Sequence, residues 1–310
     1  MAANVETMFW TREKPWHGLG VRVEESPTSK DALLLAGLDW EVEQEPIFTD
    51  EGNLISGYKA NVRNTDKRVL GVVTDRYKIV QNTEAFEFTD SLLGEGVRYE
   101  TAGSLQDGKK VWLLARLPRE YIISGERISP YLVFSNSHDG SGAVKVAITP
   151  IRVVCCNTLN LALSTAKRSW SMIHTGNVQE KIQEAKDTLF LAEKYMDELG
   201  KEIEVLRDKC LTDNQVKEFI EILLPMEEEA TILQMKNIKR LREDMTARYF
   251  DAPDLKKVGS NAYRFVNAVS DFATHSKPLR MTANYQENLF NKTVEGNPLI
   301  DKAYQMVSVA

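Results

Sequence analysis

The chain has 310 residues, of which 43% are hydrophobic, and it carries a formal net charge of -6. This length corresponds to about two domains of roughly 150 residues each, and the composition is that of an ordinary globular protein. No apolar run approaches the ~18 residues that cross a bilayer, which argues against a membrane-spanning helix.

The cysteines and the N-terminus indicate the cellular compartment. Cys155, Cys156 and Cys210 form an odd set without CxxC spacing, which disfavours both a disulfide framework and a structural zinc site. The N-terminus has neither a basic start nor an apolar core, so it does not resemble a signal peptide. We therefore expect a reduced, cytoplasmic protein without a metal ion or a cofactor.

A short helix is the first element that the pattern predicts, at residues 28–40. Thr28 or Ser29 can cap it, and Gly37 can end it. The three leucines at 33–35 are expected to form its apolar face.

A period close to two then predicts strands up to residue 134. A helix at 82–93 interrupts them, with Asn82 as its cap and Gly94 as its stop. We expect strands at 40–43, 57–63, 69–74, 98–102, 110–117 and 131–134. The first half therefore predicts an α+β fold with a mostly antiparallel sheet.

Residues 131–161 crowd polar side chains into an apolar hairpin. The stretch 136–142 has the composition of a turn between two strands. Pro150 in the second strand indicates an edge or a bulge, which would re-aim Arg152. A helix is expected to follow at 159–168.

The second half predicts long helices. A heptad seam continues over 33 residues, or roughly 50 Å of helix, and it can pack on its own chain or on a neighbouring subunit. The seam consists of Val178, Ile182, Ala185, Leu189, Ala192, Met196, Leu199, Ile203, Leu206 and Cys210. A capping box at Thr212 starts the next helix, Pro225 ends it, and further helices are expected at 226–249 and 262–275.

Three regions follow from this pattern. Residues 1–176 form an α+β domain with an N-terminal arm, 177–250 form a helical hairpin that would also serve oligomerisation, and 251–310 hold a C-terminal helix and a tail. The expected assembly is a homo-oligomer.

The charges are distributed unevenly, and this points to an anionic partner. Residues 108–170 hold nine Lys or Arg residues and only three acidic residues, which favours nucleic acid or phosphate binding. Asn157 and Thr158 would place backbone amides at a helix start beside Arg152, an arrangement that attracts anions. The alternatives are a mixed solvated surface and a plain Asn cap with Arg152 paired to a carboxylate.

The candidate contacts fall into two kinds. Basic side chains would hold phosphates, and Trp112 or Tyr77 would stack on bases. The full set of candidate nucleic-acid or anion-binding residues is Lys109, Lys110, Trp112, His138, Lys145, Arg152, Asn157, Thr158, Lys167 and Arg168.

Catalytic patterns are weaker. His138 beside Asp139 suggests an acid/base pair, and Cys156 with His138 suggests a nucleophile and its base. The competing interpretation is turn chemistry for the first pair and packing for the cysteine. No nucleotide-binding, metalloprotease or hydrolase motif is present, so we assign no catalytic residue.

Several motifs in order resemble the phage/plasmid-like protein family, domain of unknown function 932. They are PWHGLG at 15–20, DRYKIVQN at 75–82 with Phe86, NSHDG at 136–140 and RVVCCNTL at 152–159. The resemblance implies a protein of phages, plasmids or transferred islands in the bacterial cytoplasm, and it implies no activity. A looser likeness in element order exists to phage single-strand annealing proteins.

These observations predict a non-enzymatic, oligomeric phage or mobile-element protein that binds nucleic acid, plausibly single-stranded, in replication or recombination. One alternative is a module that binds and inhibits a host defence protein. A second alternative is an enzyme that acts on a nucleotide or phosphate ester through His138, Asp139, Arg152 and Cys156.

Overall fold

The computed structural model describes residues 5–11, 20–93, 98–117, 119–123, 125–152, 157–158, 169–176, 180, 184, 192–277, 279, 292 and 296–309. The chain divides into two compact units. Unit 1 consists of Met1–Arg119, Tyr131–Ile148 and Arg168–Ala192, and unit 2 consists of Glu120–Pro130, Thr149–Lys167 and Glu193–Ala310.

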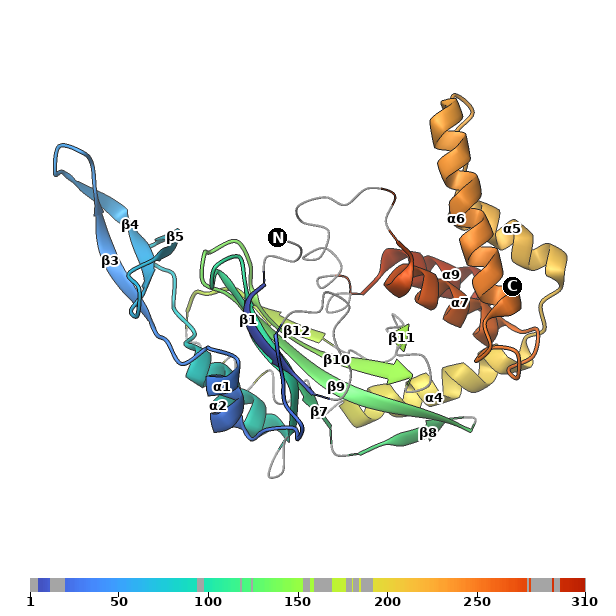
Figure 1. Cartoon of the computed structure of the whole chain (residues 1–310), viewed down its shortest axis with the longest axis horizontal. Helices are drawn as coiled ribbons and strands as arrows, with labels where there is room; N and C mark the ends of the chain where they lie inside the picture. Colours follow the sequence, from blue (N-terminus) through green and yellow to red (C-terminus); the bar gives the residue numbers. More distant parts are fainter. Residues whose placement is uncertain are drawn as a thin grey trace. The chain divides into compact units, whose positions relative to one another are not determined.

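A large, mostly antiparallel sheet confirms the α+β fold class (Figure 1). Its strand order is β11-β10-β9-β7-β6-β1-β2, with β12 paired to β10 and β8 paired to β9. In unit 1 it is built from β1 (Val5–Trp10), β2 (Val21–Arg22), β6 (Arg98–Leu105), β7 (Lys110–Arg116), β12 (Ser169–Met172) and parts of β9 (Glu126–Ser137) and β10 (Val144–Arg152). The short pairing of β1 with β2 is parallel.

Unit 1 also contains two helices, α1 and α2. α2 (Asn82–Leu93) confirms the predicted helix and packs Phe88 against Phe134 of β9, with ring centroids 5.8 Å apart. α1 (Ser29–Leu35) is shorter than predicted, and its buried residue is Ala32. The leucine face expected at 33–35 is wrong, because Leu34 and Leu35 are exposed.

A separate three-stranded sheet lies in the same unit. It has the order β3-β4-β5, from β3 (Val42–Phe48), β4 (Leu54–Arg63) and β5 (Val69–Thr74), and β3 and β4 form a long hairpin in Figure 1. Arg63 anchors it to β1, because its guanidinium donates to both carboxylate oxygens of Glu6 at 2.9 Å.

Unit 2 is mainly helical. Its elements are β8 (Tyr121–Ile123), β11 (Asn157–Thr158), α4 (Ala192–Asp208), α5 (Asp213–Leu223), α6 (Ile232–Asp251), α7 (Ala262–His275) and α9 (Pro298–Val309). Within the described residues, none of the helices combines the length and the apolar character that a membrane span requires.

The heptad seam packs within the chain where the structure describes it. Met196, Leu199, Ile203 and Leu206 of α4 are buried in the single chain, so this half of the seam is not free to join subunits. Most of the residues from 177 to 191 lie outside the described set.

Helix ends in unit 2 follow local sequence rules. The predicted capping box is confirmed, since Thr212 and Gln215 cap α5 reciprocally, and Thr231 and Gln234 do the same for α6. Buried Arg264 of α7 donates to the carbonyls of Tyr249, at 2.7 Å, and Phe250 in the last turn of α6. These contacts satisfy backbone groups that a helix end leaves open.

Candidate functional site

The turn between β9 and β10 is bound from several sides within unit 1. Asn61 of β4 donates to the carbonyl of His138 at 2.7 Å, and the Tyr77 hydroxyl donates to the carbonyl of Ser137 at 2.5 Å. Asn136 donates in return to the carbonyl of Val80 at 2.9 Å. The turn is therefore part of the core rather than a loose loop.

The ring of His138 is closed off from solvent, with 0% exposure. Its Nε2 lies 3.0 Å from Oδ1 of Asn82, whose Nδ2 donates to the carbonyls of Leu38 and Trp40. Because the Asn82 oxygen can only accept, Nε2 carries the proton. Burial, and then the nearby His174, lower the pKa of His138 to about 3, so the ring is neutral near pH 7.

A second histidine completes this hairpin cluster, which we define as His138, His174, Tyr77 and Asn82 with the turn at 136–142. His174 stacks on Tyr77 with ring centroids 4.4 Å apart. Its Nδ1 lies 2.9 Å from the carbonyl of Lys78, and the Lys78 amide donates to the His174 carbonyl at 2.7 Å. The motifs at 75–82 and 136–140 thus meet in one buried cluster.

Two glycines allow the close approach of the small sheet to the turn. A Cβ atom added to Gly71 would lie 2.5 Å from the Cα of Asp139, so any side chain there would collide with backbone. Gly140 has a φ of +77° and faces Val73, a conformation that glycine adopts without strain.

Asp139 stays ionised at the rim of the cluster. Burial alone would raise its pKa, but hydrogen bonds from Ser137 and Ser141 and the charge of Lys110 outweigh burial and lower the pKa. The hydroxyl of Ser137 donates at 2.6 Å and the amide of Ser141 at 2.9 Å. Asp139 therefore fixes the turn and does not share a proton with His138.

Basic side chains gather next to this turn on one face of the large sheet, which we call the lysine face. On β7, alternation puts Lys110 and Arg116 on the same side. Burial, and then the positive charge of Lys110, lower the pKa of Lys145 on β10. Ser137 pairs with Lys110 and Ser171 of β12 pairs with Lys145 in the strand register.

The opposite face of the same sheet is apolar. Val144 and Met172 line a small void with Phe88 of α2 and Phe134 of β9, so helix α2 covers this side. The two faces differ accordingly: one is covered by a helix, and the other carries Lys110, Lys145 and the exposed Ser171.

The structure brings only some of the predicted contacts together. Lys109, Lys110 and Lys145 lie near the turn between β9 and β10, and all three are partly exposed. Trp112 is only 8% exposed and Tyr77 is buried, so neither ring presents an open face on which a base could stack in this structure. His138 is fully buried and its Nε2 lies 3.0 Å from Asn82, so its ring is closed to a ligand from solvent in this structure.

The predicted helix start at Asn157 and Thr158 is also wrong. Both residues form β11, which pairs with Arg152 and Ile151 of β10. Their backbone therefore belongs to a sheet ladder, and the anion site loses the helix N-terminus on which it depended. Of the remaining candidates, Lys167 and Arg168 lie outside the described residues, as do Cys155, Cys156 and the predicted helix at 159–168.

Sequence reasoning missed several partners in the cluster. Asn61 and His174 had no motif to mark them, and Asn82 was read only as a helix cap, although its amide holds His138. Within the described residues, no three His, Cys, Asp or Glu side chains converge as metal ligands would.

These features define the class of the protein. It is an α+β protein with a large antiparallel sheet, a turn that buries His138, and a lysine face beside that turn. The chain belongs to the family of the domain of unknown function DUF932, whose model matches residues 69–294. No curated protein and no solved structure gives a significant match. The matched range begins at the first residue of β5 and includes both motifs of the hairpin cluster.

Proposed function

We propose that this protein binds nucleic acid, in single-stranded form, on the lysine face and does so as a homo-oligomer. The observation that carries the proposal is the position of two partly exposed lysines, Lys110 of β7 and Lys145 of β10, on a sheet whose apolar side is covered by α2. A phosphate bound beside these two lysines would gain charge-assisted hydrogen bonds from their ammonium groups.

The contacts expected from this face are to the backbone of the strand. Lysines and serine hydroxyls recognise phosphate oxygens and carry little sequence information. The buried Trp112 and Tyr77 leave base stacking without a described platform on this face. We therefore infer sequence-independent, strongly salt-dependent binding, with a slope of log affinity against log salt of about 0.7 per contacted phosphate.

This binding mode suits a phage or mobile-element protein of the bacterial cytoplasm that coats or delivers single strands during replication or recombination. The resemblance of its motifs to phage and plasmid proteins is what suggests that setting; the family match itself names a domain of unknown function.

Fluorescence anisotropy with a labelled oligo-dT strand tests the proposal. The wild type should bind at low salt and lose affinity steeply as salt rises, and the double variant K110E/K145E should bind at least tenfold more weakly. The variant K256E/K257E makes the same charge change at two exposed lysines of unit 2 and should bind like the wild type. Absence of binding at low salt, or equal binding by both double variants, would overturn the proposal.

A second candidate is a module that binds a host protein, and the outer face of the three-stranded sheet favours it. Tyr58 and Val72 project from this face and are about half exposed. Glu45 is on the same face because it pairs with Ala60. An exposed apolar face suits a protein partner better than it suits nucleic acid. Retention of one stoichiometric host protein after nuclease treatment, lost in Y58D, would favour this candidate.

A further inference from the structure

Unit 2 exposes an unusual amount of apolar surface where α5 connects to α6. We define the α5–α6 tip as residues 224–240. Within it Ile232 is 82% exposed and Leu233 is 67% exposed, while Met226 and Met235 are each 40% exposed. Every residue from 231 to 236 is exposed, so these first turns of α6 bury no side chain within the chain.

The tip is nevertheless firmly built. The capping box of Thr231 and Gln234 fixes the start of α6. Arg242 donates from Nε to the carbonyl of Leu224 at 3.0 Å and pairs with Glu221 at 3.4 Å, which joins α6 to α5. A helix end that protrudes without packing gains little from propensity alone, so an ordered end with exposed isoleucine and leucine indicates a surface that something covers.

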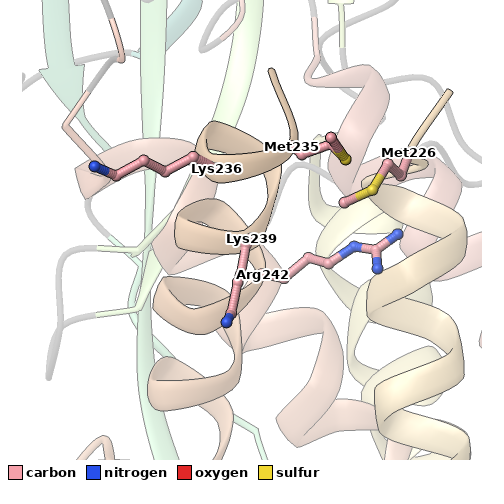
Figure 2. A pocket seen from close by; sticks show the side chains of 5 residues that line it. All are labelled: Met226, Met235, Lys236, Lys239 and Arg242. Atoms are coloured by element: carbon pink, nitrogen blue, oxygen red, sulfur yellow. The ribbon is translucent and has the colours of Figure 1, made fainter. Parts of the chain in front are cut away.

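A hollow lies beside these exposed side chains. It encloses about 420 Å³ and is lined by Met226, Met235, Lys236, Lys239 and Arg242. Figure 2 shows Met226 of the connection and Met235 of α6 near each other at one end, with the side chain of Arg242 reaching from α6 toward α5. Methionine side chains adapt to the shape of an inserted apolar group, so the hollow suits a leucine or isoleucine knob.

The charges of the tip indicate what inserts that knob. Three acidic residues, Glu227, Glu228 and Glu229, lie in the connection, and three basic residues, Lys236, Lys239 and Arg240, follow on α6. All six are exposed. Equal and opposite charges on one surface are complementary to the same surface after a two-fold rotation.

We propose that the α5–α6 tip binds the same tip of a second copy of this chain. Ile232 or Leu233 of each copy enters the methionine-lined hollow of the other, and the acidic connection of each copy meets the basic turns of the other copy's α6. Nucleic acid fits this surface poorly, because the acidic connection repels phosphate. The contact specifies the assembly included in the proposed function, but it requires no nucleic acid.

Sedimentation equilibrium of the full chain, measured without nucleic acid, tests the contact. The wild type should have the molar mass of a dimer, or of a multiple of a dimer, at micromolar concentration. The variant I232S/L233S should raise the dissociation constant of the dimer at least 30-fold. The control I122S removes a comparably exposed side chain from β8, where Ile122 is 77% exposed, and should associate like the wild type. A monomeric wild type, or I232S/L233S that associates as tightly as the control, would overturn the proposal.

Charge reversal gives a sharper second test. E227K/E228K/E229K makes the whole tip basic, and K236E/K239E/R240E makes it all acidic, so each variant alone should be monomeric. Mixed in equal amounts, they should form heterodimers, because each contact then joins a basic surface to an acidic one. Variants that associate alone as well as the wild type does, or a mixture that stays monomeric when the wild type dimerises, would contradict the two-fold contact.

This assembly and nucleic-acid binding fail separately. Dimerisation without any affinity for oligo-dT would leave the contact standing and remove the proposed function. A monomer that binds oligo-dT through Lys110 and Lys145 would do the reverse.

Discussion

The hairpin cluster of unit 1 and the α5–α6 tip of unit 2 differ in which side chains they bury and which they expose. The cluster buries polar groups and holds them with hydrogen bonds, as with Asn82 and His138, whereas the tip leaves Ile232 and Leu233 in solvent. Buried, bonded polar groups fix one conformation, and ordered exposed apolar groups serve contact with a partner. The family motifs at 75–82 and 136–140 thus mark the scaffold, and the surfaces that suit binding lie outside these two motifs.

The largest expected effect on stability comes from replacing Asn82 in the hairpin cluster. N82A deletes the acceptor for His138 Nε2 and the donor to the carbonyls of Leu38 and Trp40. Each net hydrogen bond contributes about 1 kcal/mol and an abandoned buried partner costs more, so the free energy of unfolding should fall by roughly 3 kcal/mol. Urea denaturation followed by circular dichroism measures this loss.

N53A is the matched control, because Asn53 is exposed in the turn between β3 and β4. It should change the free energy of unfolding by less than about 0.5 kcal/mol, as surface substitutions commonly do. Equal losses for N82A and N53A would mean that the cluster does not organise unit 1.

The next largest expected effect is a fall in the free energy of unfolding at acid pH. The pKa of His138 is lowered to about 3 in the folded protein from about 6.5 in the unfolded chain, so the unfolded state binds the proton more readily. The stabilisation is complete above about pH 6.5 and is lost as the pH falls toward 3. Between pH 7.5 and pH 5 this site alone should remove about 2 kcal/mol from the free energy of unfolding.

The variant H138Q isolates that contribution, because it keeps a polar side chain that does not titrate. Its stability should depend on pH less steeply than that of the wild type between pH 7.5 and pH 5, although it is less stable at pH 7.5. Parallel curves for the two proteins would show that His138 is not held neutral.

Local signals explain which parts of the fold were predictable. The strand at 69–74 and the helices at 82–93 and 262–275 match the structure at both ends. In these segments periodicity and turn or cap residues agree with the tertiary structure. The first strand, Val5–Trp10, was missed because its sequence VETMFW does not alternate. Its pairing with β6 comes from far along the chain.

The site was harder to predict than the fold, for two physical reasons. Asn157 and Thr158 carry the local signature of a helix start, but pairing with Arg152 and Ile151 makes them a strand. Alternation also predicts which residues share a face of the sheet, but it does not predict which neighbours cover that face. For this reason the sequence predicts an exposed Trp112, whereas the structure buries its ring.

The tip should respond in the opposite sense to the cluster. I232S/L233S changes two side chains that are mostly exposed in the single chain, so the stability of the monomer should change by less than about 0.5 kcal/mol. Its association should be lost, as measured by sedimentation. A loss of stability as large as that of N82A would show that these residues belong to a core, and the contrast between the two regions would disappear.

The smallest effect concerns the lysine face and has the opposite sign for stability and for binding. Burial and the charge of Lys110 disfavour the charged form of Lys145, so K145Q should raise the free energy of unfolding by a few tenths of a kcal/mol, in the range of surface charge pairs. The same change should weaken binding of oligo-dT, because a phosphate contact is lost. Thermal melting with anisotropy on the same sample gives both values. K59Q, at a partly exposed lysine of β4, should leave the binding unchanged. A lysine that lowers stability but strengthens binding is expected where selection has kept function over fold, whereas K145Q that lowers stability and leaves binding intact would make Lys145 part of the scaffold.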